Sequence, residues 1–117
     1  MYELMVEDMF DAAHQIRGYE GKCENIHGHT FRVQVFLSGE KLDKTGMVTD
    51  FKDIKESLKK VLGEFDHKNL NDLPDFKKEN PTSENIAHVI FDKMKTDLKV
   101  SKVAVWESPS SYATYSE

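Results

Sequence analysis

The chain has 117 residues, of which 38% are hydrophobic and 32% are charged, and its formal net charge is −5. This composition indicates one globular domain, 1–117, that can bury a core without disulfides, and the single cysteine excludes an intrachain disulfide. The acidic balance argues against nucleic acid as a partner, and the lack of a long apolar stretch or a signal-peptide pattern predicts a cytoplasmic protein with no membrane contact.

The first half of the chain predicts two strands joined by a polar loop. Residues 2–13 carry apolar side chains that alternate with more polar ones, which is typical of a strand with one buried face. Residues 15–26 contain glycines and many polar side chains and predict a loop. Residues 29–38 alternate strictly and predict the second strand, and a turn-rich stretch follows it.

Two amphipathic helices are predicted next. Residues 50–65 and 83–98 each place apolar side chains at steps of three and four, which forms one apolar stripe along a helix. The polar segment 66–81, with two prolines, separates them. The side chains suited to cap the two helix starts are Thr49 or Asp50 for the first, and Thr82 or Ser83 for the second.

Residues 102–107 and 112–115 predict two short closing strands around a Ser-Pro-Ser turn. The element order is therefore β-β-α-α-β-β. Hairpins at both ends predict a mainly antiparallel sheet with two helices on one face, an α+β architecture. Four strands leave open sheet edges, and open edges are usually paired or covered, so we expect oligomerisation through them.

Three of the five histidines lie within sixteen residues: His14, His27 and His29. Residues i and i+2 of a strand face the same side, so His27 and His29 can reach one ion. If the two strands pair antiparallel, His14 can face both. Three imidazoles with an open fourth position are typical of catalytic zinc, although imidazole also suits copper and nickel. The alternative is a pair of partly exposed strand histidines without a metal.

Cys23 lies four residues before His27 in a polar loop beside Lys22. Three roles remain open for its thiol. It can be the fourth ligand of a closed structural zinc site, a base that stays off the metal, or a buried inert group. A neighbouring cation lowers a thiol pKa, which argues against the inert role but does not separate a ligand from a base.

Two further acidic positions are candidates for chemistry. Asp66 precedes His67, and a carboxylate that orients a histidine is a recurring device for activating a base; taken alone, however, the pair is better explained as a solvated helix end. Glu107 shares strand parity with Val103 and Val105, so it continues an apolar row. It is either a frayed strand end or an anchor that accepts two adjacent N–H groups of a ligand.

Together these residues resemble the 6-pyruvoyltetrahydropterin synthase superfamily across nearly the whole chain. The resemblance rests on five blocks in the same order: Phe10-Asp11-Ala12-Ala13-His14, Cys23-Glu24-Asn25-Ile26-His27-Gly28-His29, Asp66-His67-Lys68-Asn69-Leu70-Asn71, Asn80-Pro81-Thr82-Ser83-Glu84 and Trp106-Glu107. It implies that the chain adopts the tunnelling fold of that superfamily. It also implies a homo-oligomer whose active sites lie between subunits. The spacing from Cys23 to His27 is similar to that of the bacterial 6-carboxy-5,6,7,8-tetrahydropterin synthases.

The resemblance also implies a reaction and a set of roles. The substrate would be 7,8-dihydroneopterin triphosphate, and the products 6-carboxytetrahydropterin, acetaldehyde and triphosphate, on the pathway to queuosine. The alternatives are the pyruvoyl activity and a non-catalytic domain with a structural zinc. The implied roles are Zn²⁺ ligands for His14, His27 and His29; catalysis for Cys23, Asp66 and His67; and pterin binding for Glu107, Thr82 and Ser83. Candidate cations for the triphosphate are Lys22, Arg17 and Arg32.

Overall fold

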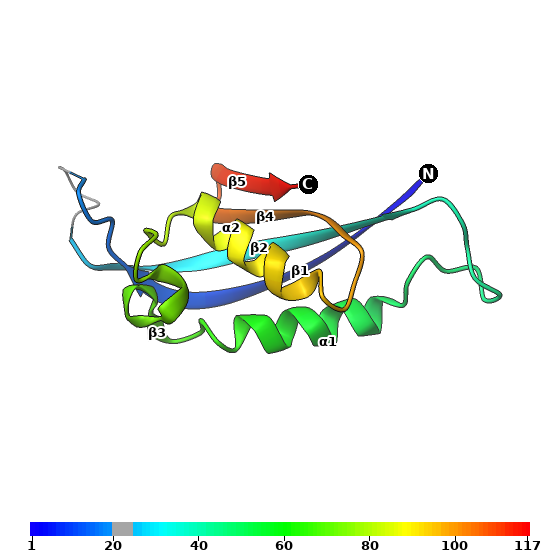
Figure 1. Cartoon of the computed structure of the whole chain (residues 1–117), viewed down its shortest axis with the longest axis horizontal. Coiled ribbons are helices and arrows are strands. Elements are labelled where there is room, and N and C mark those ends of the chain that lie inside the picture. The colour runs from blue at the N-terminus through cyan, green and yellow to red at the C-terminus, as the bar shows by residue number, and fades with distance from the viewer. Residues whose placement is uncertain (20–24) are drawn as a thin grey trace.

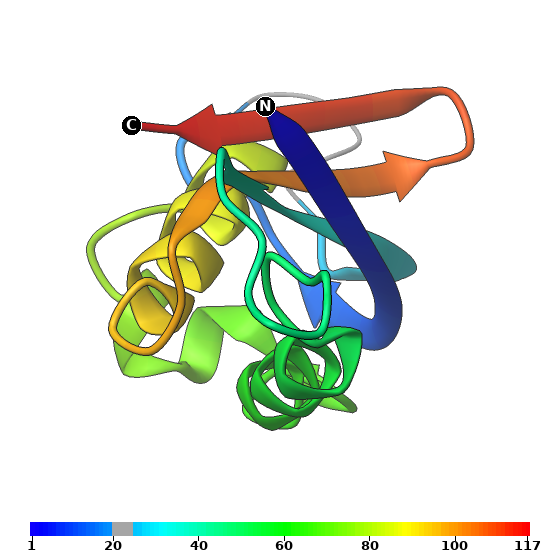
Figure 2. The ribbon, with the colours of Figure 1, turned by 90° about the vertical axis from the view of Figure 1, so that its right-hand side faces the viewer.

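The computed structural model describes residues 1–19 and 25–117, and it contains one open five-stranded sheet with two helices on one of its faces (Figure 1). The strand order is β3-β1-β2-β4-β5. The strands are β1 Tyr2–His14, β2 His27–Gly39, β3 Lys68–Asn69, β4 Val100–Ser108 and β5 Ser111–Ser116. Viewed along the molecule, both helices lie on the same side of the sheet (Figure 2). The predicted α+β class and the predicted order of four strands and two helices are confirmed.

The longest element of the fold is the antiparallel ribbon of β1 and β2. Its register runs from Tyr2 opposite Gly39 to His14 opposite His27. The pairs β2–β4 and β4–β5 are also antiparallel. The short strand β3 pairs parallel with β1, so the sheet is mixed, and the sequence did not predict this strand. Two residues are too few to show the alternation of apolar and polar side chains that predicts a strand, so β3 could not be predicted from the sequence.

Both predicted helices form, but both end earlier than the apolar stripes indicated. Helix α1 spans Phe51–Leu62 and helix α2 spans Ser83–Met94, so the predicted ends at residues 65 and 98 were wrong. Phe65 follows Gly63 in a turn and is nevertheless fully buried, because a buried side chain can continue the stripe without continuing the helix. The caps are Asp50, which accepts from Lys52 N, and Thr82, which accepts from Asn85 N.

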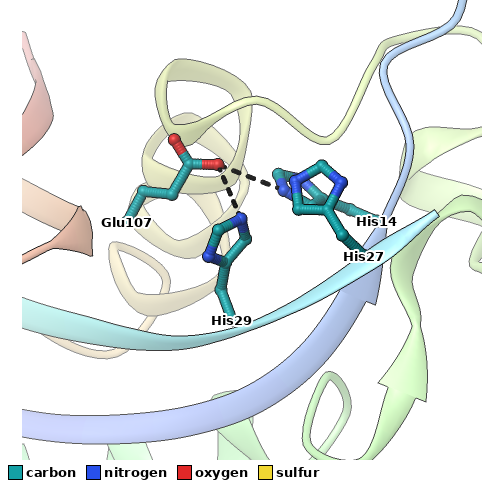
Figure 3. Close-up of side chains that lie close together, drawn as sticks. All are labelled: His14, His27, His29 and Glu107. Atoms are coloured by element: carbon teal, nitrogen blue, oxygen red, sulfur yellow. Dashed lines mark ion pairs between the residues drawn. The ribbon is translucent and has the colours of Figure 1, made fainter. Parts of the chain in front are cut away.

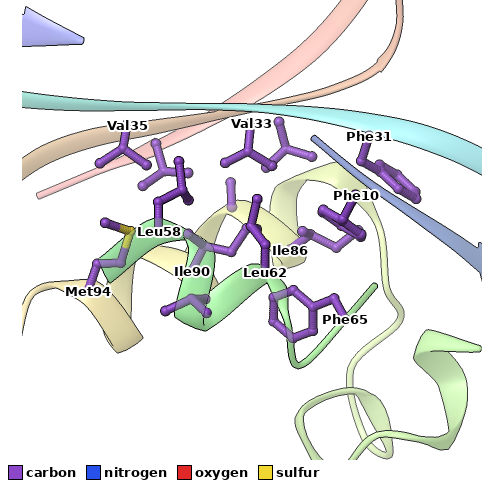
Figure 4. Packing of buried hydrophobic residues seen from close by; sticks show 14 of the residues in the cluster. Phe10, Phe31, Val33, Val35, Leu58, Leu62, Phe65, Ile86, Ile90 and Met94 are labelled. Carbon is purple, nitrogen blue, oxygen red and sulfur yellow. The ribbon is translucent and has the colours of Figure 1, made fainter. Parts of the chain in front are cut away.

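The hydrophobic core lies between the sheet and the helices (Figure 4). Phe10 of β1 stacks on Phe31 of β2 with ring centroids 5.0 Å apart, and Phe65 packs against Phe10. The same face of β2 continues with Val33, Val35 and Leu37, all fully or almost fully buried. This face reaches the loop end of the ribbon with His27 and His29, so polar side chains there extend a row that is otherwise apolar.

No described helix is long and apolar enough to cross a bilayer. Strands β3 and β5 form the two edges of the sheet. Oligomerisation through these edges stays a prediction.

Candidate active site

The pairing of β1 with β2 brings three histidine side chains to one place at the end of the sheet (Figure 3). His14 lies opposite His27, and His29 lies two residues further along β2. All three therefore point to the face that carries the core. Their ring centroids are 4.6 Å apart for His27 and His29, 4.7 Å for His14 and His27, and 5.2 Å for His14 and His29.

A fourth side chain, Glu107, reaches the same place from β4. Val103 and Val105 of β4 are buried on the core face, and Glu107 continues their row toward the histidines. Its Oε1 lies 3.2 Å from Nε2 of His14 and 3.3 Å from Nε2 of His29. These are ion-pair distances, but the atoms are not aligned as hydrogen bonds, and both Nε2 atoms remain without a hydrogen-bond partner. Glu107 is thus not a frayed strand end.

Two backbone carbonyls fix the orientation of the rings. Nδ1 of His14 lies 2.8 Å from Pro81 O, and Nδ1 of His27 lies 2.7 Å from Asn25 O. A carbonyl oxygen can only accept, so each Nδ1 carries the proton and donates. In the neutral ring Nε2 then presents a lone pair toward the centre of the group. A second hydrogen bond of this kind is what metal-binding histidines commonly have.

The protonation state of His29 also suits a metal ligand. Burial lowers the pKa of His29 below its usual value, and nearby His14 and His27 lower it further, while Glu107 opposes the shift. The neutral imidazole, which is the form that binds a metal, is therefore favoured.

The spacing of the group fits a divalent cation. Each of the four side chains offers one ligand atom, and these atoms all lie within 4.8 Å of one another. In a tetrahedral zinc site, bonds of 2.0–2.2 Å to nitrogen and oxygen separate neighbouring ligand atoms by about 3.4 Å. The distances of 3.2 and 3.3 Å from Glu107 to the two Nε2 atoms match this separation. The orphaned Nε2 atoms of His14 and His29, both buried, are what such an ion would satisfy.

Asp66 and His67 form a second, separate cluster at the β3 edge of β1. Asp66 Oδ1 accepts from Asp11 N at 2.9 Å, and its other oxygen lies 3.0 Å from His67 Nδ1. The pKa of Asp66 is lowered mainly by the Asp11 N–H, with a smaller contribution from His67. Thr30 donates to the side chain of Asp11. Neither Asp66 nor His67 belongs to the group of ligand atoms around Glu107.

His67 is held in an unusual backbone conformation. Its φ is 59°, in the left-handed region, which costs a non-glycine residue about 1 kcal/mol or more. The backbone N–H of His67 donates to Asp11 O at 2.6 Å and fixes this turn. An open hollow of about 600 Å³ borders both His67 and His29 on this edge of the sheet. His67 therefore combines a strained backbone conformation with an exposed ring at this edge of the sheet.

The profile of the 6-pyruvoyl tetrahydropterin synthase family matches residues 3–117. The chain belongs to this family. A 6-carboxy-5,6,7,8-tetrahydropterin synthase of Haemophilus influenzae is 36% identical over the whole of both chains. A dihydroneopterin monophosphate aldolase of Pyrococcus furiosus is 40% identical over 84% of this chain and 82% of its own. The structure of 6-pyruvoyl tetrahydropterin synthase from Caenorhabditis elegans superposes with a TM-score of 0.91, at 33% identity, over 99% of this chain and 95% of that one.

Within this pterin synthase chain, the remaining predicted residues have the following places. Cys23 and Lys22 lie outside the described residues. Thr82, which directly follows the Pro81 that contacts His14, caps α2 through its hydroxyl, and Ser83 is the first residue of that helix. Arg32 stacks on Trp106, 4.3 Å from the ring centroid, and pairs with Glu7.

Arg17 turns out to be a structural residue of this site. Its guanidinium donates to three carbonyls, those of Phe76, Lys77 and Glu79, and to the side chain of Asn80. Asn80 returns a hydrogen bond to Arg17 O. The clamp holds the loop whose next residue, Pro81, orients His14. The sequence offered Arg17 only as a candidate cation for the triphosphate, and it could not reveal the contact with Asn80 because the two residues are 63 positions apart.

We expect Arg17→Lys to weaken both the loop and any binding of a metal ion by the three imidazoles, while keeping the charge. A lysine cannot span four acceptors, so the free energy of unfolding should fall by about 1–2 kcal/mol. Zinc affinity should fall about tenfold, since the Pro81 carbonyl loses its fixed place. Urea denaturation and competition with a chromophoric chelator measure the two effects. Lys78→Arg, in the same loop, is the matched control.

A different outcome would show that Arg17 binds the substrate instead. If Arg17→Lys keeps wild-type stability and zinc affinity but loses affinity for inorganic triphosphate, the clamp does not support the metal site.

Proposed function

We propose that the chain is a zinc-dependent lyase that converts 7,8-dihydroneopterin triphosphate and water to 6-carboxy-5,6,7,8-tetrahydropterin, acetaldehyde and triphosphate, a step of queuosine and other 7-deazapurine biosynthesis. The observation that carries this proposal is the set of three imidazoles that present Nε2 to one place beside Glu107. The reaction itself is supported by the name of the Haemophilus influenzae relative.

The metal would be held by His14, His27 and His29. Zinc suits three imidazoles, and when bound it would act as a Lewis acid that polarises the hydroxyl groups of the substrate side chain. The carbonyls of Pro81 and Asn25 keep two of the rings in the ligating tautomer. Nε2 of each of these two rings is thereby left as the atom that can bind the ion.

Proton transfer falls to Cys23, Asp66 and His67. The thiolate of Cys23 is suited to take a proton from carbon next to the polarised hydroxyl. Asp66 is ionised at neutral pH, and the Asp11 N–H lowers its pKa further, so the carboxylate can accept from Nδ1–H of His67 and leave Nε2 free to carry a proton. Asp66 is thus a positioning residue for His67.

Recognition of the pterin ring falls to Glu107, together with Thr82 and Ser83 at the start of α2, directly after the Pro81 whose carbonyl contacts His14. A carboxylate accepts two adjacent N–H groups in bidentate fashion, and the amino-pyrimidinone edge of a pterin offers such a pair. Glu107 is about one-third exposed, so a ligand can reach it.

We further propose a cytoplasmic homo-oligomer whose active sites combine residues of neighbouring subunits. Asp66 and His67 lie at the β3 edge, separate from the imidazole cluster of their own chain. A neighbouring copy that docks at this open edge would bring His67 to the other chain's metal and Cys23.

The reaction is tested by incubating the zinc-loaded protein with 7,8-dihydroneopterin triphosphate and identifying the products by mass spectrometry. We expect acetaldehyde and 6-carboxytetrahydropterin in equal amounts. Triphosphate release without acetaldehyde would assign the pyruvoyl activity. Cleavage of dihydroneopterin monophosphate instead would assign the aldolase activity of the Pyrococcus relative. No turnover of either compound would favour a structural zinc domain.

Shared active sites are tested by complementation between inactive variants. Cys23→Ala and His67→Ala should each lower turnover by about 10²–10⁴-fold, because each removes a proton-transfer group, and each should keep its zinc. Refolding the two together at equal amounts should restore about a quarter of wild-type activity if one site takes Cys23 and His67 from different chains. Activity that stays at the level of the single variants would place both groups in one chain.

A further inference from the structure

Glu107 occupies an odd position for a residue whose only task is to hold a pterin ring. Its Oε1 lies within 3.3 Å of the Nε2 atoms of both His14 and His29, and neither contact is a hydrogen bond. Nδ1 of His14 already donates to Pro81 O, so Nε2 of the neutral ring faces Glu107 with a lone pair. A lone pair and a carboxylate oxygen repel each other unless a cation lies between them.

A metal ion resolves this repulsion better than a proton does. A protonated His14 would donate to Glu107, yet the atoms are not placed for a hydrogen bond. Oxygen and nitrogen at 3.2 and 3.3 Å are instead spaced as two neighbouring ligands of one tetrahedral ion, which lie about 3.4 Å apart. Glu107 therefore has the place of a ligand in addition to the three imidazoles.

A metal ligand needs Oε1 of Glu107 to face the imidazoles, as it does here, whereas a bidentate contact with the pterin edge needs both oxygens turned toward the ring. We propose that Glu107 is the fourth protein ligand of the metal while the site is empty of pterin, and that the pterin ring draws it away and so opens the coordination position. This proposal rests on the pterin-binding role proposed above for Glu107. Binding of the pterin ring and release of the fourth coordination position of the metal would then happen together.

The surroundings of Glu107 allow this exchange. Among the described residues its carboxylate has only the two imidazole contacts, and its side chain is about one-third exposed. It lies where the β4–β5 register shifts, between Trp106 and Ser108. Moving one carboxylate oxygen off the metal needs side-chain rotation alone. Without the carboxylate, the three neutral imidazoles would not offset the positive charge of the ion. The ion would therefore be a stronger Lewis acid.

The exchange is tested on the metal site without turnover. We compare zinc affinity by chelator competition in the wild type, Glu107→Gln, Glu107→Asp and the control Glu56→Gln, which changes an exposed carboxylate on α1. Glu107→Gln should bind zinc at least about tenfold more weakly, and Glu107→Asp should fall between it and the wild type. Glu56→Gln should equal the wild type. Far-ultraviolet circular dichroism verifies that each variant is folded.

A cobalt-substituted protein tests the second half of the proposal. Adding 7,8-dihydroneopterin, which lacks phosphates, should change the visible cobalt bands of the wild type. Glu107→Gln without pterin should already differ from the wild type and should respond less. Wild-type zinc affinity in Glu107→Gln, an unchanged wild-type spectrum with pterin bound, or a thiolate charge-transfer band from Cys23 in the resting protein would each overturn the proposal. A wrong reaction assignment would instead show only in the product analysis.

Discussion

The site depends on the register between β1 and β2. With His14 opposite His27, three imidazoles share one face, and that face is also the one packed against the helices. A slip by one residue would send the core side chains to the open face and the histidines with them, so burial of Phe10, Phe31 and their neighbours fixes the arrangement of the three imidazoles as firmly as it fixes the fold. The same strand register thus determines both the packing of the core and the positions of the three histidines.

Around this ribbon the fold supplies fixed hydrogen-bond acceptors for the imidazoles and leaves His67, a proposed proton-transfer group, at the edge of the sheet. Backbone carbonyls of Asn25 and Pro81 set the tautomers of two rings, and the Arg17–Asn80 clamp fixes the loop that carries Pro81. His67, by contrast, is exposed at an outer edge, where a second chain can meet it. The three imidazoles are thus held in place within one chain, and the proposed shared active site would be completed by a neighbouring copy.

Much of this could be predicted from the sequence because it follows from strand parity. The i, i+2 spacing of His27 and His29 and the shared parity of Val105 and Glu107 both hold in the structure. Contacts between distant segments, such as His14 with Pro81 and Arg17 with residues 76–80, leave no local period and could not be predicted. The helix ends were wrong for a related reason: Phe65 is buried by the tertiary fold and not by helical continuation.

The central claim is that the three imidazoles bind one metal ion together. The most direct measurement is the zinc content of the purified chain after dialysis against zinc-free buffer, for wild type and for His14→Gln, His27→Gln, His29→Gln and His88→Gln. We predict one zinc per chain in the wild type and in His88→Gln, whose ring lies apart on α2 beside Tyr115, and a loss of most zinc in each of the other three. Undiminished zinc in all three variants, or none in the wild type, would contradict the account.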